Sequence, residues 1–302
     1  MLQYAAKMSI QFSNQDILNR FVFDNTPIRG NTVRLHHTFN TALQHQDCPP
    51  LLRKALGELM AASALLAATL KMEGALVLQI QGKGALKLLV VECTAALTMR
   101  ATAEWSDDLG DENFAELIGN GKFVITLDPK NGNQAYQGIV PIEGETISEM
   151  LQNYMLRSEQ IETRIWLACD EHSAAGMLLQ KLPDQPEQDL DAWNRSGHLA
   201  DTVRQAELLE LSAEPLLRRL FNEEDVRLFE AQAVKFHCSC SRDSVSAMLR
   251  LLGQPEVDSI LVERGNIEVN CDFCNKHYEF DKVDAEQLFA ADIVIPSSKS
   301  KH

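Results

Sequence analysis

The sequence predicts an α+β protein in three parts: a large N-terminal domain with a mixed or antiparallel sheet and packed helices, a helical linker, and a small cysteine-rich C-terminal domain. Strand-like runs and helical runs follow each other without strict alternation, which favours a mixed or antiparallel sheet over a parallel one. An acidic segment interrupts this pattern after residue 182, and four cysteines lie close together near the C-terminal end.

The N-terminal domain is predicted over residues 10–182. It opens with a short helix over Asp16–Phe23 and a strand over Asn31–Phe39. A long helical pattern then runs from Leu51 to Lys71 behind two prolines, which suit the first turn of a helix. The second half of this helix is apolar on nearly every face, so we expect protein around it, and we expect Gly74 to end it.

The rest of this domain is predicted to be mainly strands. A hairpin is expected around Gly82-Lys83-Gly84, and a turn is expected over Pro129–Asn133. Apolar residues at helical spacing predict a helix over Thr146–Arg157. The expected strands are Ala75–Gln81, Leu86–Glu92, Thr98–Ala103, Phe123–Leu127, Tyr136–Val140, Arg164–Cys169 and Met177–Leu182.

Composition and charge exclude several classes of protein. Hydrophobic residues make up 45% of the chain and charged residues 24%, which is typical of globular proteins and excludes a wholly disordered or collagen-like chain. With 28 basic and 43 acidic residues, the net charge is −15. Nucleic acids and anionic membranes attract basic surfaces, so neither is an expected partner.

No targeting or membrane-spanning segment is expected. The N-terminal residues lack the basic, apolar and small-residue regions of a secretory signal, and Met8 offers a second start. The most apolar stretch, Leu59–Leu70, is shorter than the roughly 20 residues of a spanning helix. The sequence therefore predicts a cytoplasmic protein, in which cysteines are thiols or metal ligands rather than structural disulfides.

The linker, predicted over residues 183–234, is strongly acidic. Asp184–Glu230 holds twelve acidic residues against five arginines. One helical face is marked by Leu199, Val203, Ala206 and Leu209. Ser212 is expected to cap a second helix, whose apolar side holds Leu216, Leu217, Leu220 and Phe221. Such short helices are barely stable alone and need a partner surface. Both an ordinary helical connector and a conditionally folded switch element fit this pattern.

The seven cysteines fall into two groups. Cys48, Cys93 and Cys169 are isolated and are interpreted as small buried hydrophobic residues. The second group reads Cys238-Ser-Cys240, then a spacer, then Cys271-Asp-Phe-Cys274. Two close pairs of thiolates suit a tetrahedral Zn²⁺ site, so all four are predicted to bind one zinc ion. His237 and His277 are expected to be neighbours of this site rather than ligands.

The cysteine module is predicted over residues 235–290. Val245, Met248, Leu249 and Leu252 share a face of a helix that Gly253 ends. A second helix is expected over Pro255–Arg264, and strands are expected over Ile267–Asn270 and His277–Phe280. A core of this size commonly needs a metal or a disulfide for stability. Residues 291–302 are predicted to be a flexible tail.

Spacing alone leaves two interpretations of the module open. Zinc can be purely structural, holding a small domain together. Alternatively, the four thiolates can be oxidised to local disulfides within each pair, which removes the zinc ligands and unfolds the module. The second interpretation joins a C-terminal sensor to a marginally stable linker and an apolar domain.

The chain resembles the redox-regulated holdase chaperones of the heat-shock protein 33 family over almost its whole length. The two cysteine motifs, Cys238-Ser-Cys-Ser-Arg242 and Cys271-Asp-Phe-Cys274, are similar to the ligand motifs of that family. Further similar segments are Glu256–Ile260, Tyr136-Gln-Gly138, Glu143-Gly144, Tyr154–Gln160 and Gly176–Gln180. The combination is specific, whereas each segment alone is not.

The resemblance implies an ATP-independent chaperone that is not an enzyme and has no catalytic residue. The reduced form would be an inactive monomer with zinc on the four cysteines. Oxidation would form the disulfides Cys238–Cys240 and Cys271–Cys274, release zinc, unfold the linker and give a dimer that binds unfolding client proteins. Consistently, the sequence lacks a phosphate-binding Gly-x-x-x-x-Gly-Lys-Ser/Thr motif.

Two other functions remain as alternatives. A zinc-ribbon nucleic-acid module would need a basic surface, which the net charge of −15 disfavours. A thiol–disulfide oxidoreductase would place its Cys-x-x-Cys motif at a helix start, whereas Cys271-Asp-Phe-Cys274 lies between two strand-like runs. The spacing of the serine, histidine and acidic residues does not predict a hydrolase site.

Overall fold

The computed structural model describes residues 16–24, 26–70, 73–106, 113–129, 134–182 and 189–290. The chain forms two compact units, Met1–His237 and Cys238–His302, each with strands and helices, so the predicted α+β class is confirmed. The three-part division at residues 182, 234 and 290 stays a prediction. The N-terminal segment, the tail and most of the turn after Pro129 lie outside the described residues.

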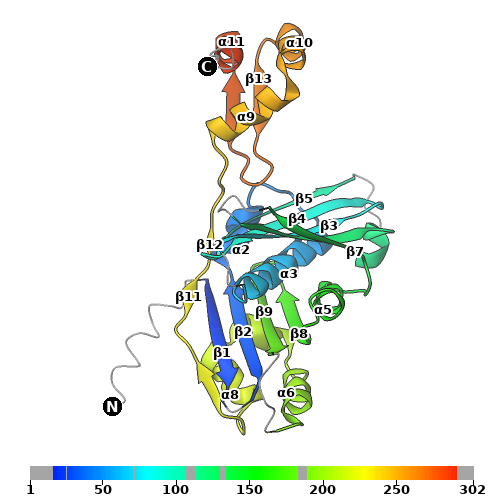
Figure 1. Cartoon of the computed structure of the whole chain (residues 1–302), viewed down its shortest axis with the longest axis vertical. Coiled ribbons are helices and arrows are strands. Elements are labelled where there is room, and N and C mark those ends of the chain that lie inside the picture. Colours follow the sequence, from blue (N-terminus) through cyan, green and yellow to red (C-terminus); the bar gives the residue numbers. More distant parts are fainter. Residues whose placement is uncertain are drawn as a thin grey trace, which may run out of the picture. The chain divides into compact units, whose positions relative to one another are not determined.

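Helix α3 (Pro50–Ala67) lies between the two sheets of the first unit (Figure 1). Thirteen of its eighteen residues are buried, as its apolar second half predicts. The helix ends before the predicted Lys71, and Gly74 begins the next strand instead of capping the helix. Among the described residues, no helix is long and apolar enough to cross a membrane.

The first sheet carries apolar side chains on both faces. Its order is β10-β1-β2-β9-β8, and β11 also pairs with β1; all its pairings are antiparallel. Strand β9 is buried along all but its last residue. Leu178 faces the main core with α3, whereas Met177 and Leu179 face the opposite side. The strands are β1 (Ile17–Phe23), β2 (Ile28–Leu35), β8 (Thr163–Cys169), β9 (Ala174–Lys181), β10 (Val226–Leu228) and β11 (Gln232–Ala233).

The second sheet has the order β12-β5-β4-β3-β6-β7, in which only the short β12 is parallel to its neighbour. The predicted hairpin and the three predicted strands after it are confirmed. Helix α5 (Ile147–Arg157) is also confirmed, with the Thr146 hydroxyl accepting from the Glu149 amide. The short helix α4 (Phe114–Ile118) was not predicted. The strands are β3 (Gly74–Gln81), β4 (Leu86–Thr94), β5 (Thr98–Trp105), β6 (Lys122–Pro129), β7 (Tyr136–Pro141) and β12 (Lys235–Phe236).

Two predictions near the N-terminus are wrong. The predicted helix over Asp16–Phe23 is strand β1, because its apolar residues serve two cores on opposite faces and therefore do not alternate. The predicted strand over Asn31–Phe39 stops at Leu35, and helix α2 (His37–Leu43) follows. The Asp16 carboxylate accepts the amide hydrogens of residues 36–38 at the start of α2, a cap supplied from a distant part of the chain.

The linker forms three helices where two were predicted: α6 (Ala192–Ala200), α7 (Gln205–Glu210) and α8 (Ala213–Leu220). The first predicted helical face is broken between α6 and α7, and Ala206 is exposed. Helix α8 begins after Ser212 as predicted, although the serine side chain makes no capping hydrogen bond. Its four predicted apolar residues, Leu216, Leu217, Leu220 and Phe221, are all buried.

The linker helices cover the apolar second face of the first sheet. Trp193, Leu208, Leu217 and other linker residues share one core with the sheet. Phe221 meets Phe23 edge to face, with ring centroids 4.9 Å apart. The sheet is therefore the partner surface that such short helices need, and we call residues 189–224 the linker layer.

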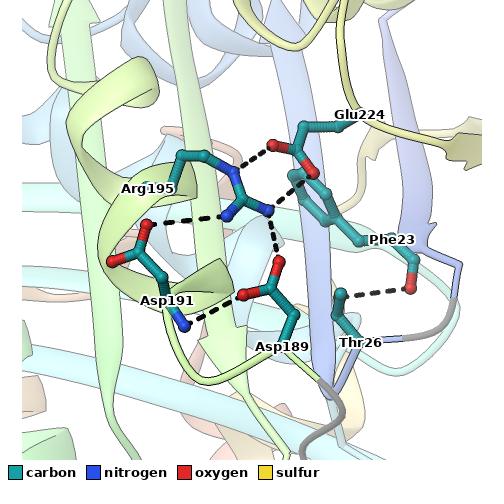
Figure 2. Close-up of polar contacts among 6 residues, drawn as sticks. All are labelled: Phe23, Thr26, Asp189, Asp191, Arg195 and Glu224. Atoms are coloured by element: carbon teal, nitrogen blue, oxygen red, sulfur yellow. Dashed lines mark hydrogen bonds and ion pairs between the residues drawn. The ribbon is translucent and has the colours of Figure 1, made fainter.

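Arg195 holds the two ends of the linker layer together (Figure 2). Its Nε lies 2.6 Å from the Glu224 carboxylate beyond α8, and its Nη2 lies 2.8 Å from Asp189 before α6. Asp191 is a third partner, at 3.6 Å. Hydrogen bonding to Glu224 and Asp189 raises the pKa of Arg195, and its hydrogen bond lowers the pKa of Asp189. The charged guanidinium therefore links the two ends of the linker layer through ion pairs at its edge.

Replacing Phe221 with alanine is expected to destabilise the linker layer by about 3–5 kcal/mol, because it leaves a cavity between α8 and the sheet. Hydrogen exchange should speed up over residues 189–224 and remain slow over α3. Arg218→Ala, which alters an exposed residue of the same helix, is the matched control and should leave exchange nearly unchanged. Equal effects of the two substitutions would contradict this account of the docking.

Candidate metal centre

Four cysteines come together in the second unit from two short segments. Cys238 and Cys240 precede helix α9 (Arg242–Leu252), which begins with a reciprocal capping box between Ser241 and Ser244. Cys271 and Cys274 lie in the turn between strands β13 (Ile267–Asn270) and β14 (His277–Phe280). A helix start and a hairpin turn therefore present two thiols each.

The spacing of the thiols suits a tetrahedral metal ion. All four Sγ atoms lie within 4.8 Å of one another. The Sγ atoms of Cys238 and Cys271 are 3.6 Å apart, and those of Cys240 and Cys274 are 3.4 Å apart. Four sulfurs at about 2.3 Å from a central ion are about 3.8 Å apart in a regular tetrahedron. The four cysteines can therefore hold one metal ion with little movement.

The turn that carries Cys271 and Cys274 is held by its own backbone. The Asn275 amide donates to the Cys271 carbonyl at 2.7 Å, and the Cys271 amide donates to the Lys276 carbonyl at 3.0 Å. Asn275 has a φ of 54°, a left-handed conformation that asparagine adopts more readily than most residues. Burial raises the pKa of the Cys271 thiol, and the Phe273 and Cys274 amides, which donate to it, offset only part of that rise.

The thiols differ in their tendency to ionise. Burial opposes ionisation of Cys240, but hydrogen bonds from Tyr278, which donates from its hydroxyl at 3.2 Å, and from the other thiols outweigh it and lower the pKa to about 7. Burial and hydrogen bonds with the other thiols raise the pKa of Cys274 to about 12. The cluster thus favours one thiolate first, and a bound cation favours the rest. The contact between Tyr278 and Cys240 is not predicted from the sequence, because the two residues are far apart in the chain and no local pattern shows that β14 lies beside Cys240.

The core beneath this cluster is small. Its buried members include Leu249, Val257 and Phe280. The helices α9 and α10 (Gln254–Arg264) and both strands are confirmed, whereas α11 (Lys282–Ala290) was not predicted. Met248 and Leu252, predicted on the apolar face of α9, are 42% and 51% exposed. A core with so few buried side chains commonly needs a metal ion or a disulfide for stability, and the cluster can supply either.

The remaining cysteines and the two neighbouring histidines lie outside the cluster. Cys93 and Cys169 are buried as predicted, whereas Cys48 is only partly buried. Burial raises the pKa of Cys48 to about 11 and the pKa values of Cys93 and Cys169 to about 12, which makes them poor nucleophiles and poor metal ligands. His277 pairs its Nδ1 with the Asn270 side chain at 2.8 Å. In the described part of the chain, the group of possible metal ligands contains only the four cysteines.

Fold and site together define a two-unit α+β protein with a cluster of four thiols that can hold a metal ion. The model of the family described as "Hsp33 protein" matches residues 16–281. The chain is 64% identical to a 33 kDa chaperonin of Methylobacillus flagellatus over 95% of this chain and 99% of the relative, and 48% identical to one of Chromobacterium violaceum over 97% and 100%. The chain therefore belongs to the Hsp33 family of chaperones.

A solved structure supports the same fold. The crystal structure of the 33 kDa chaperonin (heat shock protein 33 homolog) of Thermotoga maritima matches with a TM-score of 0.81 and covers 93% of this chain and 99% of its own. The two sequences are only 21% identical, so this similarity concerns the fold alone. The family resemblance stated from the cysteine motifs is confirmed.

Replacing any one of the four clustered cysteines with serine is expected to abolish stoichiometric metal binding, because three thiolates hold zinc far more weakly than four. Metal content per chain, measured by mass spectrometry after dialysis, checks this expectation. Cys48→Ser is the matched control and should keep one ion per chain. A Cys274→Ser protein that retained one tightly bound ion would contradict the four-thiol site.

Proposed function

We propose that this protein is a redox-regulated, ATP-independent holdase chaperone of the cytoplasm that binds unfolding proteins and prevents their aggregation. The single observation that carries the proposal is the cluster of four thiols in a thinly packed unit. Membership of the Hsp33 family supports the same conclusion. In this proposal the reduced protein is an inactive monomer, the oxidised protein is an active dimer, and neither form binds nucleic acid.

In the reduced form, Cys238, Cys240, Cys271 and Cys274 hold one Zn²⁺. Four thiolates are the donor set that structural zinc prefers, and zinc adds no redox chemistry of its own. A structural site of this kind contributes on the order of 10–16 kcal/mol of apparent binding free energy in small domains. That free energy is large compared with the stabilisation that the small core of the second unit can provide.

Oxidation removes these ligands two at a time. Each disulfide forms from two zinc-bound thiolates with the loss of two electrons. One hydrogen peroxide accepts these electrons, takes up two protons from the solvent and becomes two waters. The proposed pairs are Cys238–Cys240 and Cys271–Cys274, as the family resemblance implies. The shortest sulfur distances join members of different pairs, so the pairing rests on that resemblance and not on these distances. With two disulfides, no thiolate remains to bind zinc.

The linker layer supplies the response. Its helices are too short to be stable alone, so they fold only while docked on the first sheet. In this proposal, unfolding of the second unit, which follows the linker in the sequence, is coupled to release of the linker. Release of the layer uncovers the apolar face that contains Phe21, Met177 and Leu179. Exposed apolar surface of this kind binds unfolding chains.

Peroxide at elevated temperature is expected to release one zinc and consume four thiols, while suppression of client aggregation rises from near zero. Dithiothreitol with zinc should reverse all three changes. Zinc release, free thiols and light scattering of an aggregating client are measured on the same sample. Retention of zinc with no gain of activity would make the cluster purely structural and overturn the proposed function.

Arg195→Gln is expected to lower the temperature at which peroxide activates the protein by a few degrees, because it removes the tie between Asp189 and Glu224. Arg218→Gln, which breaks only the exposed pair with Glu214, is the matched control and should not shift it. Activation temperature is measured as the midpoint of client holding against temperature. An unchanged midpoint for Arg195→Gln would exclude this tie from the switch.

A further inference from the structure

The last part of the first unit forms a strap along the edges of both sheets. We define the strap as residues 226–237, which include β10, β11 and β12 (Figure 1). Strands β10 and β11 pair with β1 of the first sheet, and β12 pairs with β5 of the second. The strap therefore covers one edge strand of each sheet, and Cys238 follows it directly in the sequence.

The strap is attached by its backbone. In addition to the bonds between paired residues, four of its amides donate to carbonyls of the covered edges or of residues next to them, at 2.9–3.0 Å. These bonds are Phe229 to Arg20, Val234 to Asp16, Lys235 to Leu97 and His237 to Met99. The side chains contribute fewer contacts: β11 is exposed throughout, as is most of β10. Val234 lies in the main core, Phe236 packs against that core, and Val226 packs against the core shared with the linker helices. Pairing of this kind makes little demand on sequence.

The β5 edge continues past the end of β12, and a side chain imitates a peptide group there. The Gln46 side-chain amide donates to the Ala101 carbonyl at 3.1 Å and accepts from the Ala103 amide at 3.1 Å. These are the two bonds that one residue of an added parallel strand would make. The edge is therefore covered first by the strap and then by an amide that takes the place of a strand residue.

An uncovered strand edge presents a row of free amides and carbonyls that pairs readily with any extended chain. We propose that the edges of β1 and β5, once the strap leaves them, bind extended segments of unfolding client proteins by adding them as strands. This inference rests on the proposed function, because it requires the linker and strap to detach on oxidation. It adds a main-chain site to the apolar face beneath the linker layer.

Main-chain pairing suits the clients of a holdase. Unfolding proteins share no sequence, but all of them present backbone amides and carbonyls in extended stretches. Most residues of the three strap strands are exposed, so a chain of different sequence can take the same main-chain positions. Strand addition also accounts for holding without folding, because a client segment fixed as an edge strand cannot enter its own native structure.

The test is a competition on the oxidised, full-length protein. The probe is a fluorescently labelled, permanently unfolded client, reduced and carboxymethylated α-lactalbumin. A synthetic peptide of residues 226–237 competes with it, as does a scrambled version of that peptide. The matched control carries N-methyl groups on the four donating amides, of Phe229, Val234, Lys235 and His237. The control removes these four hydrogen-bond donors and leaves the side chains unchanged.

The native and scrambled peptides are expected to displace the client at similar concentrations, and the N-methylated peptide is expected to need at least ten times more. Hydrogen exchange should show β1 and β5 exposed by oxidation and protected again by client, with α3 unchanged throughout. Equal competition by the N-methylated peptide overturns the inference. So does edge protection that grows with protein concentration without client, because a second copy then occupies the edges.

The same experiment separates this inference from the proposed function. If the oxidised protein does not bind the labelled client, the holdase proposal fails and the strand-addition site fails with it. If the client binds but exchange at β1 and β5 is unchanged, only the strand-addition site is overturned, and binding belongs to the apolar face. Holding activity measured before competition therefore decides which of the two has failed.

Discussion

The structure depends on one constraint: the first sheet is apolar on both faces, so exposing either face to water costs free energy. Strand β9 is buried along nearly its whole length because alternate residues face α3 and the linker helices. Helix α3 is fixed within the main core, so that face is permanently covered. The other face is covered by a layer with little stability of its own. The sheet therefore keeps the linker folded, and the linker keeps the sheet covered.

Three kinds of interaction hold the linker and strap, and they differ in strength. Phe221 and its apolar neighbours contribute most, because a large buried side chain is worth several kcal/mol. Arg195 and the other rim ion pairs are partly exposed and contribute much less. The strap adds main-chain hydrogen bonds of intermediate strength. Because none of these acts alone, loss of one attachment weakens the others, which favours a cooperative release.

The sequence predicts an element well where local signals define it. Helix α10 and the two strands around Cys271 were predicted to within one residue, since Gly253, Gly265 and the cysteine turn mark their ends. Prediction from the sequence fails where a contact with a distant part of the chain determines the structure. The sequence of strand β1 resembles that of a helix because its apolar residues face two different cores. Helix α2 begins where Asp16, which is distant in the sequence, caps it. Likewise, Tyr278 beside Cys240 and Gln46 on the β5 edge depend on contacts that no local pattern records.

The distribution of cysteines gives the proposed switch its selectivity. Cys93 and Cys169 are buried, and their raised pKa values keep them as unreactive thiols. The four clustered cysteines lie in the unit with the thinner core, and Tyr278 stabilises a thiolate there. A thiolate is both the species that binds zinc and the nucleophile that attacks peroxide. In the proposed function, the zinc–thiolate bonds that stabilise the second unit are thus also the bonds that oxidation breaks most readily. The first unit, which must survive to hold clients, carries its cysteines where oxidants react slowly.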